Sequence, residues 1–303
     1  MRKSFAASIE KIAKKNERII FLSGDLGFNA LEGLQQTMQQ RFINMGVAEQ
    51  NMVGVAAGLA YKGYKVFCYS IAPFITYRCL EQIRIDVCFH KLPVFIIGNG
   101  GGYGYGIMGA THHALEDIAC MSSLPGISCY IPAFTEDVET SVNEIIDANS
   151  PAYLRLGLGK QGPEIQKRSA DINTVFTFPG SRVTVITVGP VIHNVLDALE
   201  PDLKNKTDLF AAVKIPITDN GDFLKSVTKN KKLIVVEEHV ARGGLAEHIA
   251  WQLQCNNISP GIFKSFHALG YPNELYGSQL YHQTQSGLDS MSLREHILAC
   301  IGE

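Results

Sequence analysis

The stretch GVAEQNMVGVAAGLAYKGYKVFCYS, residues 46–70, indicates how this chain folds. Small and apolar residues run at helical spacing as far as Gly63, which is expected to end the helix, and the apolar run at 65–70 predicts a buried strand. One charged side chain, Glu49, lies among the small and apolar residues near the start of this helix. The stretch therefore predicts a helix followed by a strand, with a carboxylate where the helix begins.

The same alternation extends over most of the chain, after an amphipathic helix in the opening twenty residues. The first half is expected to hold strands at 19–26, 65–70, 92–99, 127–133 and 152–157, and helices at 46–63, 78–90, 113–126 and 136–150. The second half is expected to hold strands at 182–189, 208–213 and 231–239, and helices at 190–200 and 243–253.

A less periodic stretch at 157–180, with Gly, Pro and charged residues, separates the two halves as an interdomain connection would. The fold class is therefore α/β, with two consecutive domains of mostly parallel sheet at 1–165 and 178–303. In such sheets the functional loops follow the carboxyl ends of the strands.

Composition limits the classes of function. The 303 residues carry a formal net charge of −2 and are 46% hydrophobic, which is typical of a soluble globular protein with no nucleic-acid partner. No apolar stretch reaches the roughly 20 residues that span a membrane. Seven cysteines without a CxxC pair or metal-ligand spacing predict reduced core thiols, a cytoplasmic protein and no metal site of its own.

Glu49 is the first candidate for chemistry. Burial would raise the pKa of its carboxyl group and make it a proton donor or acceptor, whereas the positive end of a helix would lower that pKa. The sequence leaves open which effect is larger. A helix-capping or surface glutamate is the plainer alternative.

A glycine-rich loop, GNGGGYGYGIMGATHH at 98–113, is the second candidate. So many glycines after a predicted strand indicate that a ligand or another segment approaches the backbone closely. His112 and His113 end the loop and are suited to exchange protons or to donate hydrogen bonds to an oxyanion. A surface loop with solvated histidines remains the alternative, and no GK[ST] follows that would indicate a P-loop.

Aromatic and basic residues lie between these two segments, in YSIAPFITYRCLEQIR at 69–84. Phe74 and Tyr77 are suited to form an apolar platform for a flat heterocycle, and Arg78 to contact an anion. Arg155 ends a predicted strand and would then face a cleft. Core packing of the aromatic rings and a surface ion pair of the arginine are the alternatives.

Four segments in this order resemble the second half of transketolases, and especially the separate C-terminal subunits of split bacterial and archaeal transketolases. They are GVAEQNMVGVAAGLA at 46–60, FITYRCLEQIR at 74–84, GATHHALEDIACMSSLPGISCYIP at 109–132 and LIVVEEHVARGGLAEHIAWQL at 233–253. The resemblance covers nearly the whole chain. It implies a pyrimidine-binding domain followed by a transketolase C-terminal domain.

The resemblance also implies thiamine diphosphate as the cofactor. Glu49 matches the glutamate that hydrogen-bonds the aminopyrimidine ring and favours the imino tautomer, which then removes the proton from the thiazolium carbon. Phe74 matches the aromatic residue packed on the aminopyrimidine. Tyr77 and Arg78 belong to the same expected cofactor-binding segment.

Substrate contacts are implied in the same way. His112 matches the histidine near the reacting carbonyl, so that Glu49 and His112 are the expected catalytic residues. Like Arg78, Arg2 and Arg155 match positions that contact substrate oxygens or phosphate. With His112 and His113 they form the expected substrate-binding set. The expected substrates are small sugars.

Departures from the family pattern indicate an unusual substrate. A second family histidine falls here near Gly100, and Met108 stands where an aspartate normally meets a substrate hydroxyl. Both changes make the expected pocket less polar. A less hydroxylated ketose or aldehyde is therefore conceivable.

The family's diphosphate-binding and Mg²⁺-binding motif, a GDG with a later asparagine, is missing. The nearest matches, Gly24-Asp25-Leu26 and Gly221-Asp222-Phe223, do not start that pattern. Carboxylate and carbonyl ligation of Mg²⁺ needs a dedicated site. A partner chain is therefore expected to supply the diphosphate and Mg²⁺ site, in an α2β2 heterotetramer.

Three other functions remain as alternatives to a transketolase half. The β subunit of a 2-oxo-acid dehydrogenase shares the domain pair, but THHALEDIA at 111–119 argues against it. A deoxyxylulose-phosphate-synthase-like enzyme is disfavoured by the arginine spacing in FITYR at 74–78. An inactive regulatory subunit is disfavoured because Glu49, Phe74 and His112 are all present.

Overall fold

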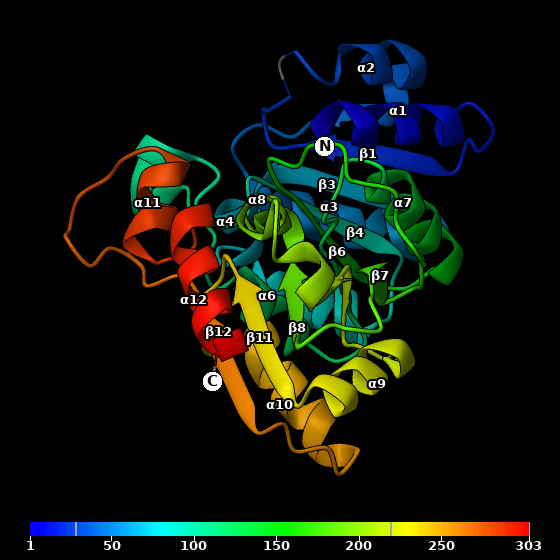
Figure 1. Cartoon of the computed structure of the whole chain (residues 1–303). Coiled ribbons are helices and arrows are strands. Elements are labelled where there is room, and N and C mark those ends of the chain that lie inside the picture. The colour runs from blue at the N-terminus through cyan, green and yellow to red at the C-terminus, as the bar shows by residue number, and fades with distance from the viewer. Residues whose placement is uncertain (28, 219, 303) are drawn as a thin grey trace.

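A seven-stranded sheet forms the first half of the computed structural model, which describes residues 1–27, 29–218 and 220–302 (Figure 1). Its strand order is β10-β5-β6-β4-β3-β1-β2, and every neighbouring pair is parallel except β10 with β5. The strands are β1 Ile19–Ser23, β2 Phe42–Asn44, β3 Lys65–Ile71, β4 Val94–Asn99, β5 Ser128–Tyr130, β6 Ala152–Leu156 and β10 Lys214–Ile215.

Helices cover both faces of this sheet, because side chains of a strand alternate between the faces. Phe21, Phe67 and Phe95 pack with α1 and α7 on one face, and Val66 and Ile96 pack with α3 on the other. The α-helices are α1 Arg2–Ala13, α2 Glu32–Met38, α3 Glu49–Tyr61, α4 Ala72–Thr76, α5 Leu80–Gln82, α6 Asp117–Ser122 and α7 Asp137–Ala148. Short 3₁₀ segments are η1 Gln39–Arg41 and η3 Gly106–Thr111, and η2 Ile83–Phe89 is a π-helix.

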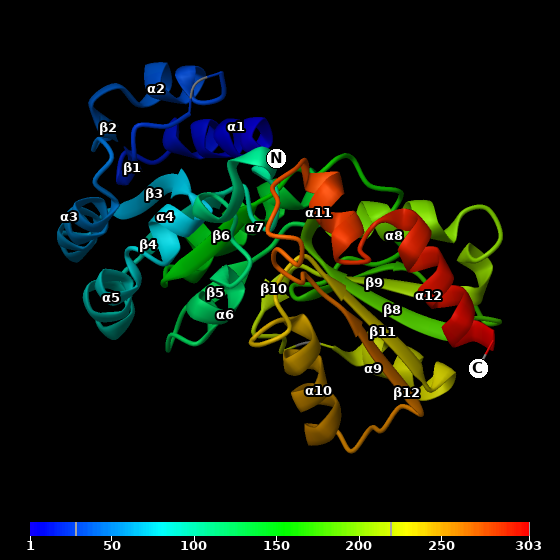
Figure 2. The ribbon, with the colours of Figure 1, turned by 90° about the vertical axis from the view of Figure 1, so that its left-hand side faces the viewer.

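The second half is a five-stranded sheet of order β12-β11-β8-β9-β7, parallel except for β7 with β9. Helices α8 and α12 lie on one face, and α9 and α10 on the other (Figure 2). The strands are β7 Ile172–Phe176, β8 Val183–Val188, β9 Thr207–Ala212, β11 Lys232–Glu237 and β12 Ile262–Phe266. The helices are η4 Gly189–Val191, α8 Ile192–Leu199, η5 Lys204–Lys206, α9 Gly221–Asn230, α10 Leu245–Cys255, α11 Gln279–Gln285 and α12 Ser290–Gly302.

The two halves share one hydrophobic core. A single cluster of buried side chains runs from Ile20 and Val66 of the first sheet through Ile118 to Leu233 and Val235 of the second. Strand β10, although it follows β9 in the chain, pairs with β5 of the first sheet. The domains are therefore packed as one body, and a side chain of the second domain can reach loops of the first.

The predicted fold class, two consecutive α/β domains, is confirmed. The predicted helix at 78–90 is observed as α5 and the π-helix η2. The stretch expected to be irregular at 157–180 contains β7, which pairs with β9 in the second sheet. The limits 1–165 and 178–303 remain a prediction, and β7 places a strand of the second sheet ahead of 178.

Candidate active site

The candidate site lies where neighbouring strands of the first sheet end. Strands β1, β3 and β4 are parallel neighbours, so their carboxyl ends share one edge. Glu49 is the first residue of α3 at this edge, and the Ser70 hydroxyl of β3 donates a hydrogen bond of 2.9 Å to Glu49 Oε1. A Cβ at Gly24, just after β1, would lie 3.1 Å from Ser70 Oγ and 3.4 Å from Glu49 Oε1. Glycine at 24 thus leaves room for the buried carboxylate.

The second oxygen of Glu49 pairs with an accessible arginine. Arg78 Nη1 donates to Glu49 Oε2 at 2.8 Å. The Glu49 side chain is 1% exposed, whereas the Arg78 side chain is 43% exposed. Water can solvate the guanidinium when this ion pair opens, whereas the buried carboxylate then needs another donor. The carboxylate can therefore exchange Arg78 for another N–H donor.

Arg78 also shows which kind of group fits beside Glu49. Its guanidinium carbon lies 4.6 Å from the centre of the Phe74 ring, so a flat, cationic N–H donor rests on an aromatic face while it bonds to the carboxylate. An aminopyrimidine ring protonated on a ring nitrogen is also flat and also donates an N–H bond. Glu49 and Phe74 therefore fit the aminopyrimidine end of thiamine diphosphate.

His112 also packs against the Phe74 ring. The two ring centres are 5.1 Å apart in an edge-to-face arrangement, and the Tyr105 ring centre lies 5.6 Å from that of His112. Nδ1 of His112 is 2.8 Å from Thr111 Oγ1, and this hydroxyl donates to the carbonyl oxygen of Met108 at 3.3 Å. The hydroxyl has one proton to donate; when the Met108 carbonyl oxygen takes it, Thr111 Oγ1 accepts from His112 Nδ1–H and Nε2 is left as the proton acceptor.

Glu49, Phe74, Arg78 and His112 thus meet at one place, although they come from three separate segments of the chain. We call these four residues the rim cluster. The other four predicted site residues, Arg2, Tyr77, His113 and Arg155, have different surroundings.

His113 lies in the domain interface. Its ring is 3% exposed, and both ring nitrogens are bonded within the chain, Nδ1 to Tyr271 Oη and Nε2 to the carbonyl oxygen of Gly106, each at 2.8 Å. Because a carbonyl only accepts, Nε2 carries the proton and Nδ1 accepts from the tyrosine hydroxyl. Burial lowers the pKa of His113 to about 4. This placement does not favour the predicted substrate contact.

Arg155 is also enclosed. Its side chain is 6% exposed, its Nε lies 3.4 Å from Asp117 Oδ2, and its Nη2 donates to the carbonyl oxygens of Ala114 and Glu238. The Tyr153 hydroxyl donates to the same Asp117 oxygen at 2.5 Å. The arginine therefore joins the two domains instead of facing an open cleft, which does not favour its predicted role toward substrate.

Arg2 and Tyr77 are the remaining two predicted site residues. Arg2 is exposed, and its charge counteracts the burial that raises the pKa of Tyr69 to about 12 and the pKa of Tyr105. Arg2 is therefore close to Tyr105, the neighbour of His112. The Tyr77 hydroxyl donates to Glu116 Oε2 and accepts from the Glu116 amide, each at 3.0 Å. Its predicted part in a cofactor platform remains a prediction.

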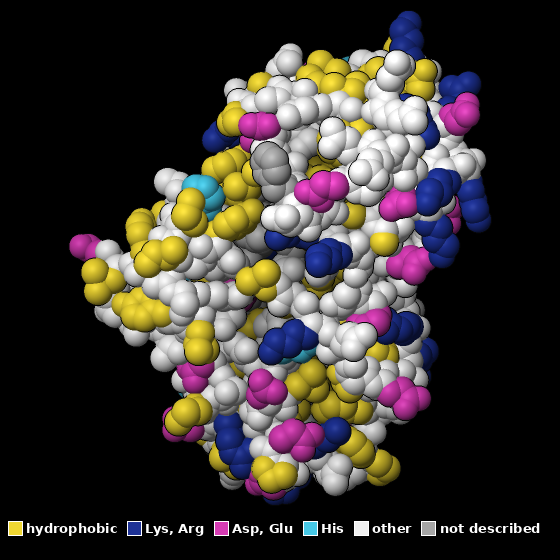
Figure 3. All heavy atoms as spheres, turned by 90° about the horizontal axis from the view of Figure 1, so that it is seen from above, with side chains coloured by type: hydrophobic (Ala, Val, Ile, Leu, Met, Phe, Trp, Pro, Cys, Tyr) yellow, Lys and Arg dark blue, Asp and Glu magenta, His cyan; other side chains and the backbone are white. Residues whose placement is uncertain are grey.

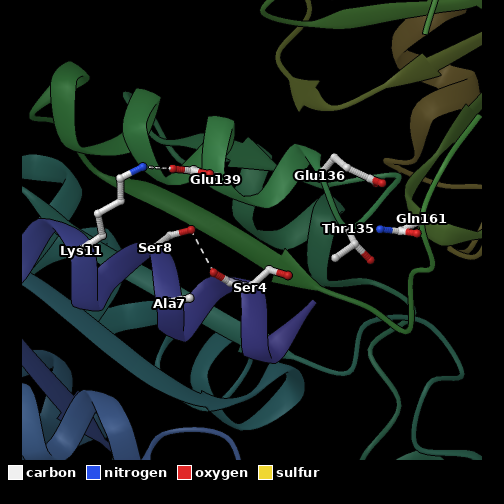
Figure 4. A pocket seen from close by; sticks show the side chains of 8 residues that line it. All are labelled: Ser4, Ala7, Ser8, Lys11, Thr135, Glu136, Glu139 and Gln161. Atoms are coloured by element: carbon white, nitrogen blue, oxygen red, sulfur yellow. Dashed lines mark hydrogen bonds and ion pairs between the residues drawn. The ribbon is translucent and has the colours of Figure 1, made fainter. Parts of the chain in front are cut away.

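A separate hollow of about 450 Å³ lies between α1, α7 and Gln161 (Figure 4). Lys11 and Glu139 form an ion pair of 2.7 Å across it, and the Ser8 hydroxyl donates to the Ser4 carbonyl oxygen. None of the predicted site residues lines this hollow, so it is not the candidate active site.

Two contributors to the rim cluster are missed by sequence reasoning. The sequence predicts Ser70 only as the end of a strand, and its partner Glu49 lies 21 residues away. Thr111 lies in the motif at 109–132, but the sequence assigns no role to Thr111 itself. The only sequence signal for this contact is that Thr111, which carries a hydroxyl, directly precedes His112.

Metal-binding and membrane-spanning features are both lacking in the part of the chain that the structure describes. Residues 1–27, 29–218 and 220–302 contain no group of three or more His, Cys, Asp or Glu side chains placed to hold a metal ion. Within the same residues, every helix is too short or too polar to cross a membrane.

Family models match both halves of the chain. The transketolase pyrimidine binding domain matches residues 1–161, and the transketolase C-terminal domain matches residues 174–283. The first match alone covers more than half of the chain. The chain therefore belongs to the transketolase family.

Its relatives include subunits of split enzymes. The chain is 29% identical to one subunit of the apulose-4-phosphate transketolase of Phocaeicola vulgatus, over 90% of this chain and 88% of that one. It is 28% identical to SqwH, a subunit of the 6-deoxy-6-sulfo-D-fructose transketolase of Clostridium sp., over 82% and 79%. A solved structure described as a split gene transketolase, inactive beta4 tetramer, shares the fold with a TM-score of 0.84, 24% identity and coverage of 99% and 98%.

Proposed function

We propose that this chain is the pyrimidine-binding half of a heteromeric transketolase, which transfers a ketol unit from a ketose to an aldose or aldehyde with thiamine diphosphate. The observation that carries the proposal is the Glu49 carboxylate, which is buried at a helix start and paired with a displaceable flat N–H donor on the Phe74 ring. The names of the split-enzyme relatives support the same reaction class.

Thiamine diphosphate supplies an acidic ring carbon that lets carbon–carbon bonds beside a carbonyl be broken and formed. The task of Glu49 is to accept an N–H bond from the aminopyrimidine and so hold one tautomer. Ser70 keeps the Glu49 side chain in place through Oε1, and Phe74 stacks on the ring. Arg78 moves out toward solvent when the ring enters, and there contacts an anionic group of cofactor or substrate.

His112 acts on the substrate. We assign the tautomer in which Nδ1–H bonds to Thr111 Oγ1, so that Nε2 carries the lone pair. That nitrogen is suited to accept a proton from a substrate hydroxyl and to return it. Arg2, which is exposed near Tyr105, is the first candidate to bind an anionic group of the substrate. Direct contacts of Tyr77 with cofactor, or of His113 and Arg155 with substrate, need local rearrangement.

The substrate is a small sugar or aldehyde. Apolar side chains are exposed over η3, which His112 directly follows, and along α11 and the loop before it (Figure 3). They are Ile107, Met108, Leu275, Tyr276 and Leu280. A substrate with fewer hydroxyl groups suits this less polar surface.

The cofactor's diphosphate and Mg²⁺ are held by a partner chain, in an α2β2 heterotetramer. Two observations support a partner: the relatives are named as subunits, and α3 exposes an apolar and small face. Tyr61 of α3 and Val47 just before the helix are more than two thirds exposed, and a Cβ at Gly54 or Gly58 would meet no atom within 4 Å beyond its own helix backbone. A reducing cytoplasm suits the seven cysteines, five of which are buried.

Calorimetric titration with thiamine diphosphate and Mg²⁺ tests the proposal. The isolated chain is expected to bind the cofactor weakly or not at all, because diphosphate and metal ligands dominate its affinity. The complex with a chain bearing the GDG motif is expected to bind it tightly and to transfer ketol units. Tight Mg²⁺-dependent binding by the isolated chain, or no activity in the complex with any such partner, contradicts the split-enzyme function.

A further inference from the structure

One buried carboxylate of the second domain bonds to the glycine-rich loop of the first. Glu238 follows β11 and is 7% exposed. Its Oε1 accepts the backbone N–H of Tyr103 at 2.5 Å. The side-chain amide of Gln279 donates to both carboxylate oxygens at 3.0 and 3.1 Å, and that of Gln283 donates to Oε2 at 2.8 Å. The carboxylate therefore receives donors alone, at both oxygens.

The direction of these hydrogen bonds is fixed by further contacts. Gln283 Oε1 accepts from Asn194 Nδ2 at 3.0 Å, so the NH₂ group of Gln283 must face Glu238. Asn194 in turn donates to the Leu288 carbonyl oxygen at 2.8 Å. A chain of hydrogen bonds thus leads from α8 through α11 to Glu238. Because the Gln279 and Gln283 amides donate to Glu238, both side-chain oxygens of residue 238 must be acceptors.

The bond to Tyr103 is made at the neck of the loop. Gly102 and Ala114 exchange two backbone hydrogen bonds of 2.9 and 3.1 Å. These bonds bring the two ends of the loop that contains His112 together. A Cβ on Gly102 would lie 2.6 Å from Glu238 Oε1, and Gly102 has a φ of +64°. Glycine is therefore required there, both for the backbone conformation and for the close approach of the carboxylate.

Two more contacts join this loop to the second domain. The buried Tyr103 hydroxyl donates to the Gly270 carbonyl oxygen at 2.9 Å, and His113 bonds to Tyr271 Oη. The loop residues between Tyr103 and His113 include the whole of η3 and His112. Fixing both ends from the second domain limits where the His112 ring can lie.

We propose that Glu238 is a positioning residue, which holds the glycine-rich loop from the second domain and thereby places His112 beside Phe74. The effect on catalysis rests on the proposed function of His112, whereas the effect on loop order does not. The second domain then contributes to the active site through a residue that touches neither cofactor nor substrate.

Hydrogen exchange of the intact chain tests the structural part. In Glu238→Gln, an NH₂ group must face the donors, so exchange of the Tyr103 and Ala114 amides should rise at least about tenfold. Glu237→Gln is the matched control, because Glu237 is also buried and accepts the Leu245 and Ala246 amides. The control should raise exchange at 245 and 246 and leave the loop unchanged.

Activity of the assembled enzyme tests the catalytic part. Glu238→Gln should lower kcat at least about tenfold and leave the affinity for thiamine diphosphate unchanged, because Glu49 and Phe74 lie outside the loop. Glu237→Gln should keep kcat. Gly102→Ala, which places a methyl group against the carboxylate, should reproduce the Glu238→Gln result by an independent route.

Unchanged exchange at Tyr103 and Ala114 in Glu238→Gln would overturn the positioning role. An equal fall of kcat in Glu238→Gln and Glu237→Gln would show that Glu238 supports only the overall stability of the fold, and would overturn its positioning role. If Glu238→Gln does not fold, Gln279→Ala removes one donor without a new clash and should loosen the same amides to a smaller degree. If Glu238→Gln speeds loop exchange but the wild-type assembly shows no transketolase activity, Glu238 still holds the loop and the proposed function is rejected instead.

Discussion

Glu49 and Asp117 are two of the buried carboxylates of the first domain that face an arginine, but their arginines differ in exposure. The side chain of Arg78, the partner of Glu49, is 43% exposed, and that of Arg155, the partner of Asp117, is 6% exposed. The Glu49 pair lies at the open edge of the first sheet. The Asp117 pair is enclosed between the domains.

The difference separates a site that can change partners from one that cannot. If Arg78 leaves Glu49, water solvates the guanidinium and another N–H donor can take its place. If the Asp117 pair opens, both charges remain buried without compensation. Residues of the rim cluster are therefore suited to bind ligands, while the enclosed pair holds the domains together.

The largest expected effect comes from changing each carboxylate to its amide. Asp117→Asn should lower the free energy of unfolding by about 3 to 5 kcal/mol, because Arg155 then stays buried without its counter-charge. Glu49→Gln should lower it by less than about 1 kcal/mol, because Arg78 is solvated. Urea unfolding of both variants measures the two values. Similar losses in the two variants would remove the distinction between the pairs.

A second effect follows from His113. Burial lowers the pKa of His113 to about 4, so between about pH 6.5 and 4 this histidine is protonated in the unfolded chain but neutral in the folded chain. Stability is therefore lost as pH falls from 6.5 to 4, by up to about 3 kcal/mol. In His113→Gln this part of the pH dependence should disappear, as seen by unfolding at several pH values. Parallel pH profiles of variant and wild type would show that His113 is not held neutral.

The smallest expected effect concerns Thr111. Thr111→Val removes the acceptor of His112 Nδ1–H, and kcat of the assembled enzyme should fall about twofold to tenfold, in line with the loss of one hydrogen bond. Thr111→Ser keeps the hydroxyl and should restore kcat. The ¹⁵N shifts of His112 should show a mixture of tautomers only in the valine variant. Wild-type shifts and kcat in that variant would exclude this role of Thr111.

The sequence predicts the fold class well because strand and helix periods alternate cleanly in both halves. It misses β7, since INTVF at 172–176 lies among charged residues, Gly and Pro. It also misses β12, which pairs with a neighbour, β11, on one side alone. Both are edge strands whose sequences carry little periodic signal, and their pairing depends on distant segments.

The candidate site is predictable only in part. Motifs single out Glu49, Phe74 and His112, and the structure brings these three together. The family motif distinguishes His112 from His113, but hydrophobic periodicity cannot, because neighbouring residues of an irregular loop have no period that assigns them to opposite sides. Their difference depends on Tyr271, which lies 158 residues beyond His113. Contacts between domains of this kind leave no local pattern.

The activation of the cofactor by Glu49 is the central claim. Exchange of the thiazolium proton of thiamine diphosphate for deuterium, quenched with acid and read by proton NMR in the complex with the partner chain, measures this step directly. In Glu49→Gln the exchange should be slower by at least about a hundredfold, since the amide cannot hold the same tautomer. Exchange as fast as in the wild-type complex would contradict the assignment and leave Glu49 as a residue that merely begins α3.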